Sequence, residues 1–307
     1  MPNLLDIRRR IRSVRNTQQI TQAMKMVSAA KLRRAQEQAL AARPYARQIG
    51  ELLNGLAPFL DPQALADARL PGEEWALSAL LAQPPVRKRL IIVITTDSGL
   101  VGGFNANVIK AALAAAQGAG SGAAQNAAAV SYDAVGRKGR DALKRRGAEL
   151  AAERIGVFTR GVDPAAAPAI AVAAMRAFAT GAVDEVLITG NQFKSVLQQT
   201  LVTQRLLPFE LAGSANAPGA GRDYIFETPP VTLLAQLLPR AIEARVQAAL
   251  LESLAAEHAA RMNAMEAATS NAGELIDTLT LNMNRVRQAA ITKEIIEVVS
   301  GAAAAQG

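Results

Sequence analysis

The sequence predicts an α/β fold combined with a long antiparallel coiled coil, in which the N- and C-terminal helices form a shaft and a central α/β domain forms a foot. Both ends of the 307-residue chain place apolar residues at the three- and four-residue spacing of one helix face. Between them, short β-branched runs alternate with helical segments, which is typical of a largely parallel sheet. We place the boundaries at 1–57 for the first shaft helix, 58–86 for a connection, 87–211 for the α/β domain, 212–230 for a loop and 231–307 for the second shaft helix.

The N-terminal helix has an apolar seam that stops partway along it. The seam begins at Leu4, Ile7, Ile11 and Val14, and the same spacing then reaches four polar or charged positions: Gln18, Thr21, Lys25 and Ser28. Apolar residues follow the rhythm displaced by one position, at Ile20, Met24 and Val27. A helix that changes its buried face needs more than one partner. Further along, Pro44 is expected to kink the helix because proline removes a hydrogen-bond donor.

Basic charge gathers in this helix. Residues 1–34 contain nine lysines and arginines against Asp6 alone, an excess equal to the net charge of +8 on the whole chain. The partner of the helix should therefore be acidic. An arginine-rich start is also typical of a mitochondrial transit peptide, but Asn3 and Asp6 at capping distance favour a structural helix. The chain has no run of about 18 apolar residues that could span a bilayer.

The central segments are assigned from their alternation. Residues 58–86 contain five prolines and favour a mixed connection with a short helix at 73–81. Strands are expected at 89–95, 128–136, 153–158, 184–190 and 198–208, and helices at 105–116, 137–147 and 164–180. Right-handed crossovers then produce a Rossmann-like, largely parallel sheet whose last two strands form a hairpin. Residues 212–228 are rich in glycine, alanine and proline and are expected to be a loop.

A heptad frame runs through the C-terminal helix. From Leu234 to Lys293, fifteen of the eighteen core positions are apolar, and the exceptions are His258, Thr269 and Lys293. We expect Pro239 to lie in the first turn of this helix, after a short helix opened by Thr228. Several core positions are alanine, which buries little apolar surface, so the helix pair should need support from outside the chain.

No catalytic or metal centre and no cofactor are predicted. The chain has no cysteine and one histidine, His258, which we interpret as a polar residue that sets coiled-coil register. The turn TTDSGLVGGFN, residues 95–105, follows a strand but matches neither dinucleotide- nor phosphate-binding loops, so Asp97 is expected to serve the turn. The basic stretch 136–146 lacks the interleaved aromatic residues of a nucleic-acid site and indicates a solvated helix face.

Four motifs resemble those of the gamma subunit of the rotary F-type ATP synthase. The opening LLDIRRRIRSVRNTQQITQAMKMVSAAKLRRAQ and the closing RMNAMEAATSNAGELIDTLTLNMNRVRQAAITKEIIEVVSGAAA resemble its two ends. TTDSGLVGGFN resembles its middle motif and VGRKG a further one. The resemblance covers the chain in the right order. It implies a central-stalk rotor subunit that transmits torque between a membrane rotor c-ring and a catalytic hexamer of alpha and beta subunits.

The resemblance also implies partners and a location. In that family the terminal helices lie inside the hexamer, while the α/β domain stands on the c-ring and binds the epsilon subunit. The chain would therefore regulate ATPase activity and proton flow without being catalytic, bind no nucleic acid and have no membrane span of its own. Since no targeting segment is recognised, it would be peripheral on the cytoplasmic face of the bacterial inner membrane.

Five residues carry over as contacts with the hexamer. Met24 and Lys25, in MKMVSAAK, would lie near the acidic lever region of a beta subunit. Arg287, Gln288 and Thr292, in RQAAITKE, resemble the group that hydrogen-bonds a loop of the hexamer. The seam positions Gln18, Thr21, Lys25 and Ser28 are then expected to form a bearing surface, and IIEVVSGAAAA would enter a hydrophobic sleeve.

The chain departs from the family at a few positions. The family often has arginine and cysteine at Ser98 and Val101, and tyrosine at Met283. The paired regulatory cysteines of chloroplast members are missing, which excludes thiol switching. Two other functions remain open from the residues alone: an α/β enzyme that binds nucleotide through Asp97 and the glycine turn, and a basic coiled-coil protein whose affinity for nucleic acid falls steeply with salt.

Overall fold

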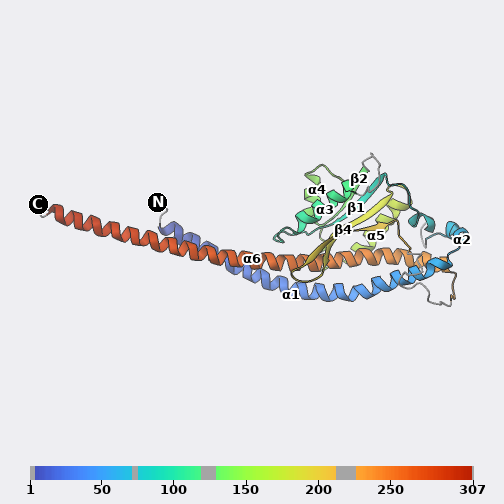
Figure 1. Cartoon of the computed structure of the whole chain (residues 1–307), viewed down its shortest axis with the longest axis horizontal. Coiled ribbons are helices and arrows are strands. Elements are labelled where there is room, and N and C mark those ends of the chain that lie inside the picture. The colour runs from blue at the N-terminus through green and yellow to red at the C-terminus, as the bar shows by residue number, and fades with distance from the viewer. Residues whose placement is uncertain (1–3, 71–74, 119–128, 212–225, 306–307) are drawn as a thin grey trace. The chain divides into compact units, whose positions relative to one another are not determined.

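The computed structural model describes residues 4–70, 75–118, 129–211 and 226–305, in two compact units. One unit contains both chain ends, residues 1–29 and 261–307, and the other contains residues 30–260. The long helices α1 (Leu4–Leu56) and α6 (Pro230–Ala305) each contribute to both units (Figure 1). The two predicted terminal helices are therefore present.

A five-stranded sheet lies at the centre of the second unit, in the order β3-β2-β1-β4-β5. Its strands are β1 (Lys88–Ile94), β2 (Ala129–Val135), β3 (Glu149–Arg154), β4 (Glu185–Phe193) and β5 (Gln199–Leu207). The pairs β1–β2, β1–β4 and β2–β3 are parallel, whereas β5 runs antiparallel to β4. The predicted largely parallel sheet and its final hairpin are confirmed.

Helices cover both faces of this sheet. The connections between strands contain α3 (Phe104–Gly118), α4 (Arg137–Lys144) and α5 (Ala166–Ala179). Along β1, Leu90, Ile92 and Ile94 join a core that includes α5 and α6. The alternate residues Ile91 and Val93 point to the opposite face, because side chains alternate along a strand, and α3 packs on β1. Figure 1 shows α3 and α4 on one side of the sheet.

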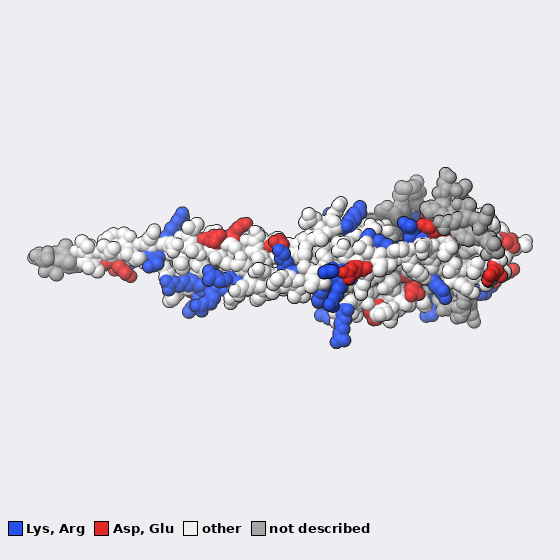
Figure 2. Space-filling view, turned by 90° about the horizontal axis from the view of Figure 1, so that it is seen from below, with Lys and Arg blue, Asp and Glu red and all other residues white. Residues whose placement is uncertain are grey.

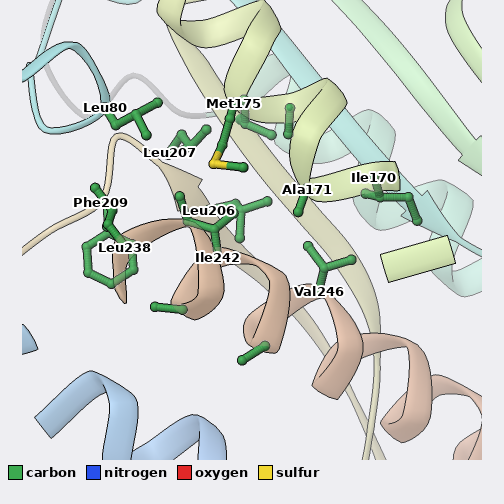
Figure 3. Packing of buried hydrophobic residues seen from close by; sticks show 14 of the residues in the cluster. Leu80, Ile170, Ala171, Met175, Leu206, Leu207, Phe209, Leu238, Ile242 and Val246 are labelled. Carbon is green, nitrogen blue, oxygen red and sulfur yellow. The ribbon is translucent and has the colours of Figure 1, made fainter. Parts of the chain in front are cut away.

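The core of the second unit joins the sheet to both long helices. Figure 3 shows Ile170 and Met175 of α5, Leu206 of β5, and Leu238 and Ile242 of α6 meeting in one cluster. Helix α1 enters the same cluster through Ile49, Leu53 and Leu56, which are also buried. Burying side chains of this size contributes about 1.5 to 3 kcal/mol each. Within this unit, the sheet and the two helices are therefore held by one shared core.

Two predicted elements differ in the structure. The third strand is β3 at Glu149–Arg154 rather than at 153–158, because Val157 packs into the core from the turn after the strand. Helix α6 begins at Pro230 and continues through Pro239, so the separate short helix before it was wrong. Buried Leu238 and Ile242 anchor the helix on both sides of Pro239, which offsets the cost of about 3 kcal/mol of an interior proline.

The connection before the sheet contains short elements. Helix α2 (Pro62–Asp67) begins after Asp61, whose carboxylate accepts hydrogen bonds from the first turn. Single 3-10 turns occupy Ala57–Phe59 and Leu77–Leu80. The second of these replaces the end of the short helix expected at 73–81, and the beginning of that helix lies outside the described residues. Most of the expected loop 212–228 also lies outside them.

Candidate functional site

In the first unit, α1 and α6 pair along the stripe that the sequence begins. Ile7 is buried, and so are Thr21 at 8% exposure and Ser28 at 3%. On α6 the heptad positions Met265 and Ala272 are buried, and further ones are half-buried: Met262, Ile276, Leu279, Met283 and Val286. By contrast, Ile20 is 60% and Val27 55% exposed. The same face of α1 therefore stays buried where its residues become polar, and the apolar residues displaced by one position remain exposed.

Hydrogen bonds and one ion pair satisfy this polar part of the seam. The hydroxyl oxygens of Thr21 and Thr269 lie 2.7 Å apart, and Gln18 Nε2 donates to the carbonyl of Thr269 at 3.5 Å. Lys25 Nζ forms an ion pair with Glu266. The expected bearing surface was therefore wrong for Thr21 and for Ser28, whose hydroxyl donates to the Met24 carbonyl at 2.8 Å. Small hydroxyl groups can be buried here because helix carbonyls accept their protons.

Large apolar side chains of this unit face outward instead. They include, with exposures of 44% to 71%, Leu5, Ile20, Met26, Val27, Leu275, Leu281, Ile291, Ile295, Ile296, Val298 and Val299. Extended exposed apolar surface marks protein interaction sites. The unit is therefore a candidate protein interface.

The same helices carry the basic cluster predicted from the sequence. Arg8, Arg9, Arg10, Arg12 and Arg15 are all exposed, and Figure 2 shows blue side chains gathered near the N-terminal end of α1. Among the described residues, their only ion pair joins Arg9 to Asp6 at 4.0 Å. A surface that combines exposed apolar side chains with unpaired arginines suits an acidic protein partner.

The five predicted contact residues fall into two groups. Met24 and Lys25 are half-buried, and the Lys25 ammonium turns to Glu266 within the unit. Arg287, Gln288 and Thr292 are exposed on α6, where the Thr292 hydroxyl donates to the Gln288 carbonyl at 2.9 Å. Within the part of the chain that the structure describes, no hydrogen bond or ion pair joins the two groups. Each group can therefore contact a partner independently.

The glycine-containing turn after β1 is organised from within. Asp97 accepts hydrogen bonds from the backbone N–H of Arg137 at 3.0 Å and of Gly156 at 3.1 Å, one with each carboxylate oxygen. The Asn105 side chain accepts a hydrogen bond from the backbone N–H of Thr96 and donates one to the Thr96 hydroxyl. That hydroxyl in turn donates to the Ser98 carbonyl. The predicted turn role of Asp97 is confirmed. This geometry gives no support to the nucleotide-binding hypothesis, since both oxygens of the carboxylate serve the turn.

Sequence reasoning missed an ion pair, with Arg43 exposed and Glu252 buried, that ties three elements together. Glu252 of α6 accepts from Arg43 Nε of α1 at 2.8 Å and from the backbone N–H of Phe193, at the end of β4, at 2.9 Å. Arg43 also donates to the Phe193 carbonyl at 2.9 Å. The hydrogen bond to Glu252 raises the pKa of Arg43. Since Arg43 and Glu252 are 209 positions apart, no local pattern could have paired them.

A buried charge cluster lies on the sheet. The Glu185 carboxylate accepts hydrogen bonds from Arg89 Nε at 2.6 Å and from Arg205 Nε at 3.1 Å. Both Arg89 and Glu185 are almost fully buried. On β2, burial raises the pKa of Asp133, and its pair with Arg154 opposes that rise. These groups are used for structure, because each charge already has a partner.

The basic helix α4 matches its predicted role. It buries Gly139, Ala142 and Leu143, while Lys144 pairs with Glu153 at 2.6 Å. Arg140 hydrogen-bonds Asp141 and lowers the pKa of that carboxyl. The charged side chains therefore lie on the solvated face of the helix.

The described residues contain neither a cluster of metal-binding side chains nor a helix suited to span a membrane. Across those residues, no three His, Cys, Asp or Glu side chains come together as a metal site would require. No helix in the described ranges combines the length and apolar character needed to cross a membrane.

Comparison with known sequences matches the whole chain to one family. The model of the family described as ATP synthase matches residues 3–305. The ATP synthase gamma chain of Solibacter usitatus is 51% identical over 306 residues, which is 100% of both chains. That of Chlorobaculum parvum is 43% identical over 303 residues, or 98% of each chain.

Solved structures show the same fold. A chain in the central stalk and c-ring structure of the Tetrahymena thermophila mitochondrial ATP synthase has a TM-score of 0.58 and 25% identity, covering 81% of this chain and 99% of that one. A chain of the Euglena gracilis mitochondrial ATP synthase has a TM-score of 0.65, covering 98% of this chain and 94% of that one. Its identity is 19%, so this second likeness concerns the fold alone.

Proposed function

This chain belongs to the ATP synthase gamma chain family, and from that premise we propose which of its surfaces meet the other parts of the enzyme. It is the central-stalk rotor subunit of an ATP synthase, and it transmits torque. The observation that carries this function is the use of α1 and α6 in both units. They pair with each other in the first unit and share a buried core with the sheet in the second.

Torque can pass from the helices to the sheet because the joint between them is buried and specific. Leu53 of α1 and Leu238 of α6 lie in the same core as β5 and α5. Arg43 and Glu252 add hydrogen bonds to both backbone groups of Phe193 at the end of β4. Close-packed interiors are barely compressible and transmit strain. A twist applied to either helix is therefore carried into the sheet rather than lost in a loose contact.

The first unit is the surface that meets the alpha and beta subunits. Its exposed apolar side chains and unpaired arginines provide apolar contact and positive charge for an acidic partner. In this proposal Met24 and Lys25 lie near the acidic region of a beta subunit, while Arg287, Gln288 and Thr292 hydrogen-bond a loop of the hexamer. The second unit meets the c-ring and the epsilon subunit.

The chain itself is not catalytic in this proposal. Asp97, the carboxylate of the glycine-containing turn after β1, accepts a backbone hydrogen bond with each of its oxygens. Nucleotide chemistry then belongs to the other subunits, and this chain regulates ATPase activity and proton flow by turning between them. The complex containing it would lie on the cytoplasmic face of a bacterial inner membrane.

Co-expression tests the assembly. When this chain is expressed with the alpha and beta subunits of a bacterial enzyme, we expect the three to co-purify as a complex with ATPase activity. The control is alpha and beta expressed alone. If the chain does not co-purify with them, the proposed function is wrong.

The same complex tests the contact on α6. Arg287→Ala should slow ATP hydrolysis about tenfold if a charged hydrogen bond to the hexamer is lost. Arg285→Ala is the matched control, since Arg285 is exposed on the same helix two residues away. Equal rates in the two variants would remove Arg287 from the proposed interface.

A further inference from the structure

The second unit contains a cavity that is lined by none of the five contact residues named above. Its volume is about 630 Å³, and it lies between α1, β5 and α6. Small-molecule sites in proteins have volumes of roughly 300 to 1,000 Å³. The cavity walls include Gly50 of α1, Arg205 of β5, Phe209 and Glu210 just after β5, and Arg245 of α6.

Arg245 gives this cavity a positive charge that no hydrogen bond holds in the described part of the chain. Its guanidinium carbon lies 4.0 Å from the centre of the Phe209 ring, and that ring is buried and points toward α6 (Figure 3). Among the described residues, Arg245 has no hydrogen bond and no carboxylate within 4.0 Å. Stacking on an aromatic ring fixes a guanidinium while leaving its N–H edge free to bind.

The second arginine of the cavity is largely neutralised. Arg205 Nε bonds Glu185 at 3.1 Å, and its Nη1 bonds Glu210 at 2.6 Å. Glu210 also lines the cavity. Its carboxylate forms an ion pair with Arg205 and acts on Arg245 only through space, without a direct contact. The Nη2 group of Arg205 has no partner among the described residues, so two guanidinium groups can offer N–H donors to one ligand.

Gly50 leaves space on the opposite wall. It lies inside α1, where glycine costs about 1 kcal/mol relative to alanine, and a Cβ built there would meet nothing within 4 Å. Packing within the described chain therefore does not require a glycine at this position. A ligand that approaches the helix backbone would.

We propose that this cavity binds a phosphomonoester through Arg245, with Arg205 as the second donor and Gly50 providing room for the rest of the molecule. A phosphate group has three terminal oxygens, which suits two guanidinium groups better than a carboxylate with two. The source is either a small soluble phosphorylated metabolite or the headgroup of a lipid such as phosphatidic acid.

Calorimetry on the full chain tests the site, with sn-glycerol 3-phosphate as the probe and glycerol as the uncharged control. We expect glycerol 3-phosphate to bind and Arg245→Gln to weaken it at least about tenfold, because a charged hydrogen bond is lost. Arg240→Gln removes an exposed charge from the same helix without touching this cavity and should change nothing. Flotation with phosphatidylcholine vesicles, with and without phosphatidic acid, distinguishes a lipid source from a soluble one.

Two further variants separate binding from folding. Gly50→Leu should block the cavity, while Gly50→Ala should raise the melting temperature, because no packing in the chain opposes it, and should weaken binding, because the ligand approaches the helix backbone at this position. Glu210→Gln should strengthen binding, because it removes the only carboxylate of the cavity wall that competes with the ligand. If neither glycerol 3-phosphate nor phosphatidic acid binds, or if binding is unchanged in Arg245→Gln with a native circular dichroism spectrum, the proposal is wrong. The assay contains no alpha or beta subunit, so either result leaves the rotor function unaffected.

Discussion

Lys25, a residue of the candidate interface, has two kinds of acidic partner: Glu266 in its own unit and a carboxylate of another subunit. The Lys25 ammonium pairs with Glu266 inside the first unit, and that carboxylate is 62% exposed. An exposed ion pair of this kind contributes about 0 to 1 kcal/mol. The pair is therefore weak enough for an acidic group of another subunit to compete for Lys25.

Lys25→Gln and Glu266→Gln distinguish the two roles of this pair. Both variants break the ion pair, but only Lys25→Gln also removes a charge that a beta subunit could bind. We expect Lys25→Gln to lower ATP-driven proton pumping per ATP hydrolysed in the assembled enzyme, and Glu266→Gln to leave it near the parent value. If the two variants lower pumping equally, Lys25 acts only through Glu266.

Glycine at position 136 is required by a close approach as well as by its backbone angle. Its φ is +94°, and a Cβ there would lie 2.3 Å from the Thr95 carbonyl oxygen. Gly147 also has a positive φ, of +68°, but a Cβ there meets nothing within 4 Å. The first glycine of VGRKG is therefore required because the residue after β1 lies too close to leave room for a side chain before α4.

Gly136→Ala and Gly147→Ala measure these two costs separately. Gly147→Ala should lower the free energy of unfolding by about 1 to 2 kcal/mol, the cost of a left-handed backbone with a Cβ. Gly136→Ala should cost at least about 2 kcal/mol more, because the Thr95 backbone must also move. Denaturant unfolding followed by circular dichroism gives both values, and similar losses would contradict the steric explanation.

At the scale of elements, the two terminal helices pair through a seam that is only partly apolar. Residues Thr21, Ser28 and Thr269 occupy positions where a coiled coil usually has leucine or isoleucine. Their hydroxyl groups bond to each other or to helix carbonyls, so burial leaves them satisfied. The apolar residues that would have strengthened the seam are exposed instead and are available to partners.

A double-mutant cycle tests the central hydrogen bond of this seam. Thr21→Val and Thr269→Val each keep the side-chain shape and remove one hydroxyl. We expect a coupling energy of about 1 kcal/mol between them, as for a neutral hydrogen bond. The double variant should then be less destabilised than the sum of the single ones. Additive losses in thermal unfolding would show that the two hydroxyl groups do not interact.

At the scale of the whole molecule, the chain has exposed apolar surface that its own residues do not cover. In the last turns described for α6, Ile295, Ile296, Val298 and Val299 are 57% to 71% exposed. A soluble monomer rarely exposes contiguous apolar patches of more than a few hundred Å². We therefore expect another protein surface to cover these residues on assembly.

The isolated chain is therefore expected to self-associate. Sedimentation velocity should show oligomers that disappear when Ile295, Ile296 and Val298 are replaced by serine, because less apolar surface is then removed from water on association. Serine at the exposed positions Asn282 and Asn284 of the same helix is the control and should have no effect. A chain that stays monomeric at all concentrations would contradict this account of its surface.

The sequence alone was sufficient for the fold class and for the elements at both ends. Three- and four-residue spacing identified α1 and α6, and β-branched runs identified four of the five strands, because both signals report which face of a local segment is buried. The signal failed at Val157, where an apolar residue enters the core from a turn. It also failed at Thr21 and Ser28, because residue type alone does not reveal that a hydroxyl is satisfied by its own helix.

The tertiary structure decided which distant side chains of this chain contact one another. The sequence determined that two amphipathic helices flank an α/β domain, and its long terminal motifs indicated a rotor subunit. Only the fold brings Arg43 to Glu252 and to Phe193, and only the fold places Arg245 over the Phe209 ring. The physical reason is that local periodicity depends on neighbours a few positions away, whereas hydrogen bonds and cavities depend on groups that meet after the chain has closed on itself.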